Sequence, residues 1–544
     1  MEKAPLLHGS PSSRRFDARG PNAVQQFLRG LCVILLAINV YSLAFRAHEY
    51  FSQRWERASL NYGNEHISWK RCGTIKGHQL ECSSVDVPMD QFDSVNSADK
   101  TFNIPLVRLR GKNAHKNIVL NPGGPGASGI NFIYDFGESL NAQVGEGFHL
   151  VSFDPRGVNS STPVASCYPD DETRKRLSKV RTSDLIRDSP ELYAWATNFA
   201  RACNETLGEH GRYLNTPQTA ADMNNILDAL GQNEMYYWGF SYGTVLGQTY
   251  ATLFPDRVGR MVIDGVVDQD GWFEKQVDDT LYVDSAKVLS GFFEECFKSG
   301  ENCELSGFAK SSTELEAKTK RAINNLRSAP ASVYVNSSLW GELTDHKLWY
   351  DGVYREIYTP ETWPRLAHNL AQLLNGSATD AFIAYGQGDL FAPVGESYRV
   401  IALNDAKSGP DYWPQKRLDL LKVVLPFFDK YFFAKAQHQL YYMKQQWSLP
   451  RTHNYVPQKE VKTANPLLVL SMRYDPVCPL KSAKGAKQIF AGSRLVEVNG
   501  YGHCSLAMPS GCLDEHIRRY FNEGKLPDGD TTCEIDQPYF PARN

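Results

Sequence analysis

The sequence predicts an α/β fold, with a mostly parallel central sheet that is interrupted by a mainly helical insertion. Three observations support this. Short apolar runs that end in turns alternate with stretches of helical spacing between about residues 102 and 269. The alternation stops near Gln269, and strand-like runs return only at NPLLVLSMRYDP and SRLVEVNGYGHC. Alternating strands and helices form a parallel sheet with helices on both faces. The insertion is expected to cover the strand ends, where such a sheet binds its ligand.

The individual elements follow from local pattern. NIVLN, FHLVSF, EMYYWGF and RMVID are expected as strands, and ASGINFIYDF, TAADMNNILDALG and TVLGQTYATLF as the helices between them. In TAADMNNILDALG, Thr219 is the expected N-cap, Met223 and Ile226 lie on the apolar face, and Gly231 ends the helix.

Length and composition suit a large catalytic domain with an insertion. The chain has 544 residues, and its net charge of -3 gives no reason to expect nucleic acid as a partner. We divide the chain into a disordered N-terminal tail (1–28), an apolar segment (29–47), the first part of an α/β core (60–269), a helical cap (270–460) and the second part of the core (461–544).

Residues 30–45 form an uncharged apolar run near the N-terminus. The run is slightly short for a spanning helix, which needs about 20 residues, and the tail before it is long for a signal peptide. We interpret it as an uncleaved signal anchor, which makes the chain a single-pass type II membrane protein with a lumenal or extracellular catalytic part. The alternatives are a signal peptide cleaved after Ala44, which gives a secreted protein, and a buried core helix.

The cysteines agree with an oxidising compartment. Ten of the eleven lie beyond the apolar run, and the near pairs Cys72/Cys82, Cys167/Cys203 and Cys296/Cys303 are natural disulfide candidates. The other four could form two more, and spacing alone does not give their connectivity: Cys478, Cys504, Cys512 and Cys533. The sequence has neither a CxxC nor an HExxH motif, so no metal site is expected. Sequons make four asparagines glycosylation candidates: Asn159, Asn204, Asn336 and Asn375.

The stretch GFSYG places Ser241 between a strand-like run and a helix-like run. It fits G-x-S-x-G, in which a nucleophilic serine occupies a strained turn above the sheet. Side chains at Gly239 and Gly243 would collide across such a turn. The motif alone is weak in a chain with 41 glycines, but its position between a strand and a helix makes it specific. Ser241 is the predicted nucleophile, and the alternative is an ordinary turn serine.

A serine nucleophile needs a base and an acid that orients the base. Asp475 directly follows one returning strand and His503 follows the next, so both are expected at the same sheet edge as Ser241. Asp264, at the end of an earlier strand, is the alternative acid. His516 is the nearest rival base, but it lies in a helix-like stretch.

A glycine-rich loop, NPGGPGASG, follows the strand NIVLN. Two backbone N–H groups must face the oxyanion that forms during acyl transfer. One is expected from Tyr242, directly after the nucleophile, and the other from this loop. We favour Gly123, with Gly124 second. In FDPRG, Asp154 and Arg156 are expected to brace the surrounding loops.

These segments together resemble a known family. NPGGPGASG, FDPRGVNSS, GFSYGTVLGQTYATLFPDRVGRMVIDGVVD, YDPVCP and GYGHCS are similar to the α/β-hydrolase peptidase family S33, in the subgroup of secreted tripeptidyl aminopeptidases related to proline iminopeptidases. The resemblance covers roughly residues 100–275 and 465–535. It implies an α/β-hydrolase fold and a serine exopeptidase, or a related amide or ester hydrolase, without a cofactor. Pro122 stands where proline iminopeptidases have histidine, in agreement with the tripeptidyl subgroup.

Two hydrolytic functions share this predicted site. An aminopeptidase that releases short N-terminal peptides or single residues needs a carboxylate for the substrate's ammonium group, and the cap offers four candidates: Glu274, Asp389, Glu396 and Asp405. An esterase, lactonase or amidase for a small apolar molecule needs an apolar pocket, which aromatic cap residues such as Trp349 and Tyr350 would line. A third possibility, a non-catalytic binding module on the same fold, predicts a damaged triad. An unpaired carboxylate in the pocket favours the aminopeptidase, and a purely apolar pocket favours the second function.

Overall fold

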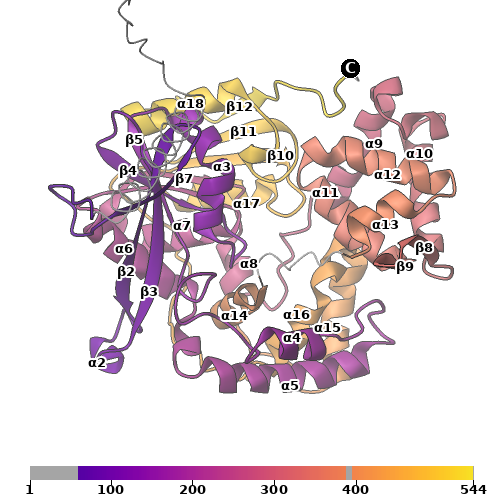
Figure 1. Cartoon of the computed structure of the whole chain (residues 1–544), viewed down its shortest axis with the longest axis horizontal. Coiled ribbons are helices and arrows are strands. Elements are labelled where there is room, and N and C mark those ends of the chain that lie inside the picture. The colour runs from indigo at the N-terminus through magenta and orange to yellow at the C-terminus, as the bar shows by residue number, and fades with distance from the viewer. Residues whose placement is uncertain (1–58, 388–394, 543–544) are drawn as a thin grey trace, which may run out of the picture. The chain divides into compact units, whose positions relative to one another are not determined.

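A ten-stranded, mostly parallel sheet is the centre of the part that the computed structural model describes, residues 59–387 and 395–542 (Figure 1). Its strands lie in the order β1-β2-β3-β5-β4-β6-β7-β10-β11-β12. Their bounds are β1 Lys70–Ile75, β2 His78–Pro88, β3 Thr101–Leu109, β4 Lys116–Asn121, β5 Phe148–Phe153, β6 Met235–Phe240, β7 Val258–Asp264, β10 Leu468–Tyr474, β11 Arg494–Tyr501 and β12 Thr531–Glu534.

The sheet changes from antiparallel to parallel along its width. β1, β2, β3 and β5 pair antiparallel, whereas every pair from β5 through β4, β6, β7, β10 and β11 to β12 is parallel. β6 is buried along its whole length, as expected for a strand covered on both faces. The C-terminal ends of β6, β10 and β11 therefore meet at one edge of the sheet, and the loops that follow them come together there.

Helices cover both faces, as the sequence predicts. On β4, Ile118 and Leu120 belong to one apolar core and Val119 to the other, because successive side chains point to opposite faces. The first core packs against α3 (Gly129–Val144) and α18 (Gly511–Glu523), and the second against α6 (Thr216–Ala229), α7 (Tyr242–Leu253) and α17 (Leu480–Ile489).

The residues between β7 and β10 are mainly helical and lie beside the sheet (Figure 1). Phe292 and Trp363 of this segment belong to the same apolar core as Leu470 and Val498 of the sheet, so the insertion packs firmly on the strands. The main elements are α8 Gln269–Phe273, α9 Ser285–Lys298, α10 Ser312–Asn325, a π-helix η5 Lys347–Tyr354, α12 Trp363–Leu374, α13 Thr379–Tyr385, α14 Gly395–Asp405, α15 Arg417–Lys430 and α16 His438–Gln446. Before the insertion, α5 (Ser189–Leu207) packs along α15 and α16, and Arg174 of α4 (Asp171–Leu177) contacts Glu396 of α14 (Figure 1).

Two local expectations are corrected. Helix α6 begins three residues before Thr219: its N-cap is Asn215, whose side chain accepts a hydrogen bond from the Gln218 amide, and Pro217 occupies the first turn. Proline fits there because its missing N–H is not needed in the first turn. The insertion also holds a β-hairpin, β8 (Ala331–Asn336) with β9 (Leu339–Leu343).

Disulfides join the three predicted near pairs, Cys72–Cys82, Cys167–Cys203 and Cys296–Cys303. Cys512–Cys533 forms a fourth. The expected fifth does not form, since Cys478 and Cys504 are buried free thiols near the ends of β10 and β11. The disulfides are typical of an oxidising compartment.

The predicted signal anchor at residues 30–45 and the tail before it lie outside the described residues. A search of the described helices finds none with the length and apolar character needed to cross a bilayer.

Candidate active site

Ser241 occupies a sharp turn between β6 and α7. Its φ is +55°, a left-handed conformation that is costly for a residue with a side chain and is typical of functional sites. Its amide donates to the carbonyl oxygen of Asp264 on β7 at 2.9 Å. The turn thereby holds the serine at the C-terminal edge of the sheet.

The flanking glycines are required by close backbone contacts. A Cβ atom on Gly239 would lie 2.4 Å from the carbonyl oxygen of Gly243, across the turn. A Cβ on Gly243 would lie 2.6 Å from the carbonyl oxygen of Asn121 on β4. Both separations are too short for any side chain, which is the steric reason predicted from GFSYG.

His503 and Asp475 lie against each other after β11 and β10. Nδ1 of His503 is 2.9 Å and 3.0 Å from the two carboxylate oxygens of Asp475. Asp475 is fully buried and also accepts from the amides of Val477, Cys478 and Cys504 at 2.8–3.1 Å. A carboxylate beside Nδ1 favours the tautomer with the proton on Nδ1, which leaves Nε2 as an acceptor.

The backbone of His503 is held as well. Its amide donates to the carbonyl of Tyr358 at 2.8 Å, and the two rings meet edge to face with centroids 5.2 Å apart. Tyr358 comes from the insertion, so a cap residue fixes the histidine that follows β11. Nothing in the local sequence around Tyr358 signals this contact.

The alternative acid and base have other surroundings. The carboxylate of Asp264 accepts from the amide and the hydroxyl of Ser505, and burial raises its pKa to about 6. His516 lies on α18 beside the Cys512–Cys533 disulfide. Asp475 and His503 are therefore the pair that the structure brings together.

The thiol of Cys478 connects the serine to this pair. It contacts the side chain of Ser241 and lies within 4.8 Å of a ring nitrogen of His503 and a carboxylate oxygen of Asp475. Burial raises the pKa of this thiol well above its ordinary value, so it stays protonated. Sequence reasoning assigned Cys478 to a disulfide, and its position three residues after Asp475 is the signal that could have placed it here.

The glycine-rich loop between β4 and α3 packs directly on the serine turn. A Cβ on Gly123 would lie 2.4 Å from the carbonyl oxygen of Phe240 and 2.9 Å from the amide nitrogen of Tyr242. The Gly123 amide, however, donates to the Asn121 side chain at 3.0 Å. Gly124 is exposed, and its amide makes no hydrogen bond within the described residues. This arrangement favours Gly124 over Gly123 as an oxyanion donor, because the Gly123 amide already has a partner, and the choice between the two stays a prediction.

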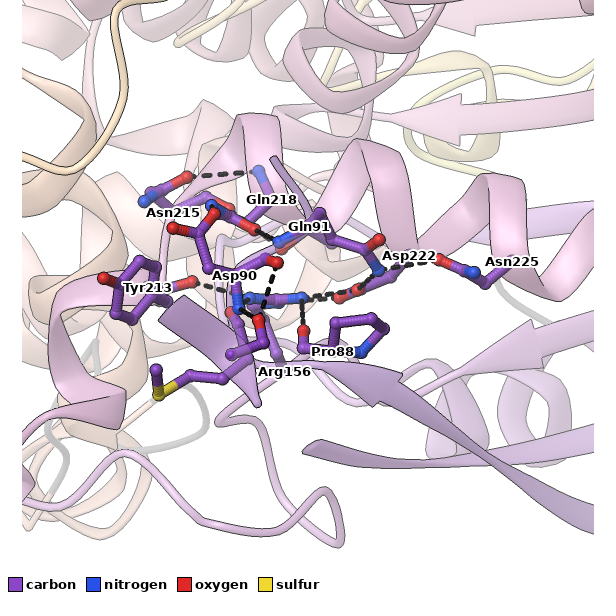
Figure 2. A network of polar contacts seen from close by, with 12 residues as sticks. Pro88, Asp90, Gln91, Arg156, Tyr213, Asn215, Gln218, Asp222 and Asn225 are labelled. Carbon is purple, nitrogen blue, oxygen red and sulfur yellow. Dashed lines mark hydrogen bonds and ion pairs between the residues drawn. The ribbon is translucent and has the colours of Figure 1, made fainter. Parts of the chain in front are cut away.

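A buried ion pair holds the loops behind the site (Figure 2). Arg156, directly after β5, binds both carboxylate oxygens of Asp222 on α6 at 2.5 and 2.7 Å, and both side chains are fully buried. The same guanidinium donates to the carbonyls of Pro88, Met89 and Tyr213. One side chain thus joins the end of β2, the turn before α6 and α6 itself, which supports the predicted bracing role.

Asp154 braces the glycine-rich loop. Its buried carboxylate accepts from the Ser128 hydroxyl at 2.6 Å, the Ile130 amide and the Asn159 side chain. The Asn159 nitrogen, one of the four glycosylation candidates, therefore already supports this loop. All four candidates are exposed: Asn159, Asn204, Asn336 and Asn375.

A cavity of about 930 Å³ opens beside the glycine-rich loop. Pro122, next to Gly123, lines it, and α3, α4, α5, η5, α14 and α16 form its walls, whereas Ser241, Asp475 and His503 are not among its lining residues. Its lining is mixed. Phe132, Phe136, Trp195 and Tyr350 supply apolar surface, and six charged residues supply the rest: Asp135, Arg174, Lys347, Asp351, Glu396 and Arg399. This volume lies in the upper part of the range for ligand sites.

The described candidates for binding a substrate amine have protein partners, as their hydrogen bonds and ion pairs show. Glu274 pairs with Lys407 at 2.7 Å. Glu396 lines the cavity but binds Arg174 through both oxygens at 2.9–3.1 Å. Asp389 lies outside the described residues.

Asp405, the remaining candidate, is fully buried in a network of its own. It accepts from the Thr216 amide and hydroxyl and from the Trp272 indole at 2.6–2.8 Å. Neither Asp405 nor the paired glutamates offer a free carboxylate in this structure, and binding of a substrate amine by any of the three stays a prediction.

Comparison with known proteins places these features in a family. Residues 116–507 match the family model described as alpha/beta hydrolase fold. Tripeptidyl aminopeptidase of Streptomyces lividans is 26% identical over 490 residues, which cover 86% of each chain. Serine protease Hip1 of Mycobacterium tuberculosis (strain ATCC 25618 / H37Rv) is 26% identical over 77% of this chain and 80% of its own. Carboxylesterase B of Mycobacterium tuberculosis (strain CDC 1551 / Oshkosh) is 25% identical over 86% of this chain and 89% of its own.

Proposed function

The chain belongs to the alpha/beta hydrolase fold family, and from that premise we propose that it is a serine hydrolase that releases short peptides or single residues from peptide N-termini. The observation that carries the peptide substrate is the lining of the 930 Å³ cavity. A hydrolase for small apolar molecules needs an apolar pocket, whereas this lining carries charged side chains among aromatic rings. A mixed lining suits the backbone amides and varied side chains of a peptide.

The proposed mechanism uses three side chains and two amides. His503 accepts the proton of Ser241 through Nε2 as the serine attacks the scissile carbonyl. Asp475 holds the imidazole and stabilises its charged form. The amides of Tyr242 and Gly124 bind the oxyanion: both are near the turn, and the Tyr242 amide is the first of α7, where amides lack helical partners. His503 then protonates the leaving amine, and water releases the acyl group by the same steps.

The resemblance to family S33 and the location belong to the same proposal. A relative named tripeptidyl aminopeptidase matches most of the chain, and four disulfides suit the secretory lumen or the cell exterior. The apolar segment at residues 30–45 would anchor the chain, or would direct its secretion if it is cleaved.

Turnover of a substrate panel by the purified full-length chain tests the function. The panel contains peptide anilides with free and with acetylated N-termini and short acyl esters. Ser241→Ala is expected to abolish turnover of all substrates while the circular dichroism spectrum stays unchanged. Ser337→Ala, in the exposed turn of the β8–β9 hairpin, is the matched control and should retain full activity. Turnover by Ser241→Ala at the wild-type rate would refute the assignment.

The second function, hydrolysis of small esters or amides, keeps one specific observation in its favour, because a relative named Carboxylesterase B also matches most of the chain. Cleavage of the acyl esters with no cleavage of any peptide anilide would make it the better assignment.

A further inference from the structure

A carboxylate without a partner lies where the insertion begins. Asp284 directly precedes α9 and is half-buried; its backbone carbonyl accepts from the Val288 amide, whereas its carboxylate makes neither a hydrogen bond nor an ion pair with any described residue. Asp170 and Asp268, at the same position before α4 and α8, accept amide hydrogen bonds from their own helices. Carboxylates that lose water in a folded protein are normally paired. Asp284 therefore carries the desolvation cost of burial without a compensating contact.

A series of tyrosine contacts connects the segment that carries Asp284 with the proposed catalytic histidine. Tyr282, two residues earlier, is buried, and its ring centroid lies 6.3 Å from that of Tyr354. The Tyr354 hydroxyl accepts a hydrogen bond from the Tyr358 hydroxyl at 2.9 Å. Tyr358 in turn contacts the ring and the amide of His503.

The first turn of α9 also contacts the residue before the proposed catalytic acid. Lys287, one helical turn further on, places its ammonium 5.7 Å from the ring centroid of Tyr474, the residue before Asp475. Lys287 itself pairs with Glu294 at 3.4 Å, so it does not neutralise Asp284. The start of α9 consequently lies over the loop that carries Asp475.

Electrostatics agree with this position. Burial first, and the negative charge of Asp475 second, raise the pKa of Asp284 to about 6. A cation beside Asp284 would offset both the desolvation of its carboxylate and the repulsion from Asp475.

The segment that connects α8 and α9 (residues 274–284) contains a second carboxylate oxygen without a hydrogen-bond partner among the described residues. Asp278 is more than nine-tenths buried: Oδ1 accepts from the amide and hydroxyl of Thr280, whereas Oδ2 has no partner within the described residues. After burial and the charge of Asp475, the charge of Asp278 also contributes to the raised pKa of Cys478, the thiol that contacts Ser241. The carboxyl of Asp278 therefore lies within electrostatic range of the thiol that contacts Ser241, and Lys275 and Lys444 lie within range of the same carboxyl.

We propose that Asp284 binds the protonated N-terminal amine of the peptide substrate and so makes the enzyme selective for free N-termini. The proposal rests on the proposed function and adds to it the group recognised and the residue that recognises it. An ammonium beside Asp284 would supply the missing partner through a charge-assisted hydrogen bond. The anionic connecting segment would also orient the peptide with its N-terminus towards the start of α9.

Asp284→Asn, which keeps the shape and removes the charge, tests the proposal in the full-length chain. The readout is kcat/KM for each peptide anilide with a free and with an acetylated N-terminus, beside a short acyl ester. The variant is expected to lose roughly 10- to 100-fold on free-amine peptides, because one hydrogen bond to a charged group is removed. Acetylated peptides and the ester should change less than about twofold. Asp284→Glu should recover part of the loss.

Asp411→Asn is the matched control, because Asp411 is an exposed carboxylate of the insertion that does not line the cavity and has no hydrogen-bond or ion-pair partner within the described residues. It should leave the ratio of free-amine to acetylated turnover unchanged. A ratio that survives Asp284→Asn would overturn the proposal, and so would an equal loss on all substrates, which indicates a structural role.

The same assays distinguish a failure of the hydrolase assignment from a failure of the Asp284 proposal alone. If the wild type and Ser241→Ala are equally inactive on the whole panel, the hydrolase assignment and the Asp284 proposal both fall. If wild-type turnover depends on Ser241 but is equal for free and acetylated peptides, the hydrolase assignment stands and the Asp284 proposal alone is wrong.

Discussion

Asp222→Ala is expected to destabilise the protein strongly, because it leaves the Arg156 guanidinium charged and unpaired inside the fold (Figure 2). Both side chains of this pair are fully inaccessible to solvent. Removing one member of a buried ion pair typically costs about 3–5 kcal/mol. The three backbone carbonyls that accept from Arg156 remain, but they do not neutralise its charge. The expected loss is a large fraction of the roughly 5–15 kcal/mol that stabilises a typical fold.

The assay is urea unfolding followed by fluorescence, with Asp228→Ala as the matched control. Asp228 is on the same helix, and it pairs with Arg257 at 2.8 Å, but its side chain is 58% exposed. Exposed pairs contribute about 0–1 kcal/mol, so the control should unfold near the wild-type midpoint. Ester turnover of folded Asp222→Ala should also fall, because the pair holds the turn before α6 to the loop after β5.

A loss in Asp222→Ala that stays within 1 kcal/mol of the loss in Asp228→Ala would refute the reasoning, because burial would then make no difference. The double variant with Arg156→Met and Asp222→Leu separates the two causes. It removes both charges, and it should be more stable than Asp222→Ala alone if the unpaired charge is the main cost.

Three further predictions concern the turn, the triad and the cap. Gly243→Ala should give little soluble, active protein, because the new Cβ would lie 2.6 Å from a carbonyl oxygen of β4. The control is Gly63→Ala, which has open space around it and should express and hydrolyse esters like the wild type. Asp475→Asn should lower kcat by about 10⁴-fold with an unchanged fold, as for triads in general, and a loss below tenfold would contradict its role. The hydrogen bond from His368 to Glu304, supported by a second carboxylate, raises the pKa of His368 above its usual 6.5. The protonated His368 side chain therefore stabilises the fold fully below pH 6.5, and this stabilisation is lost as pH rises through the raised pKa. His368→Gln should consequently lower Tm more at pH 5.5 than at pH 8.5. Equal decreases in Tm at both pH values would show that the charge of His368 does not contribute.

Local pattern was enough to predict the parallel centre of the sheet and where its strand ends meet, but not the outer strands β1, β2, β3 and β12. The apolar runs before Ser241, Asp475 and His503 mark β6, β10 and β11, and parallel strands carry their C-terminal ends to one edge. The steric need for Gly239 and Gly243 could be predicted too, since it depends on a turn whose geometry the motif itself specifies.

Partners distant in the chain could not be predicted. Glu396 pairs with Arg174, 222 residues away, and Asp405 binds Thr216, 189 residues away. A carboxylate with no oppositely charged residue nearby in the sequence can therefore still have a partner in the folded protein. The sequence offers no rule for which carboxylate remains unpaired, and Asp284 was overlooked for that reason.

By itself, then, the sequence determined the α/β fold, the helical insertion and the three residues at the sheet edge, because strand periodicity and turn chemistry are local properties. Only the tertiary structure decided that Gly123 donates to Asn121 and leaves Gly124 exposed, that Cys478 stays a thiol beside Ser241, and that the Asp284 carboxylate has no partner among the residues that the structure describes. These outcomes depend on tertiary contacts between residues that are distant in the sequence, and one local sequence is compatible with many different sets of such contacts.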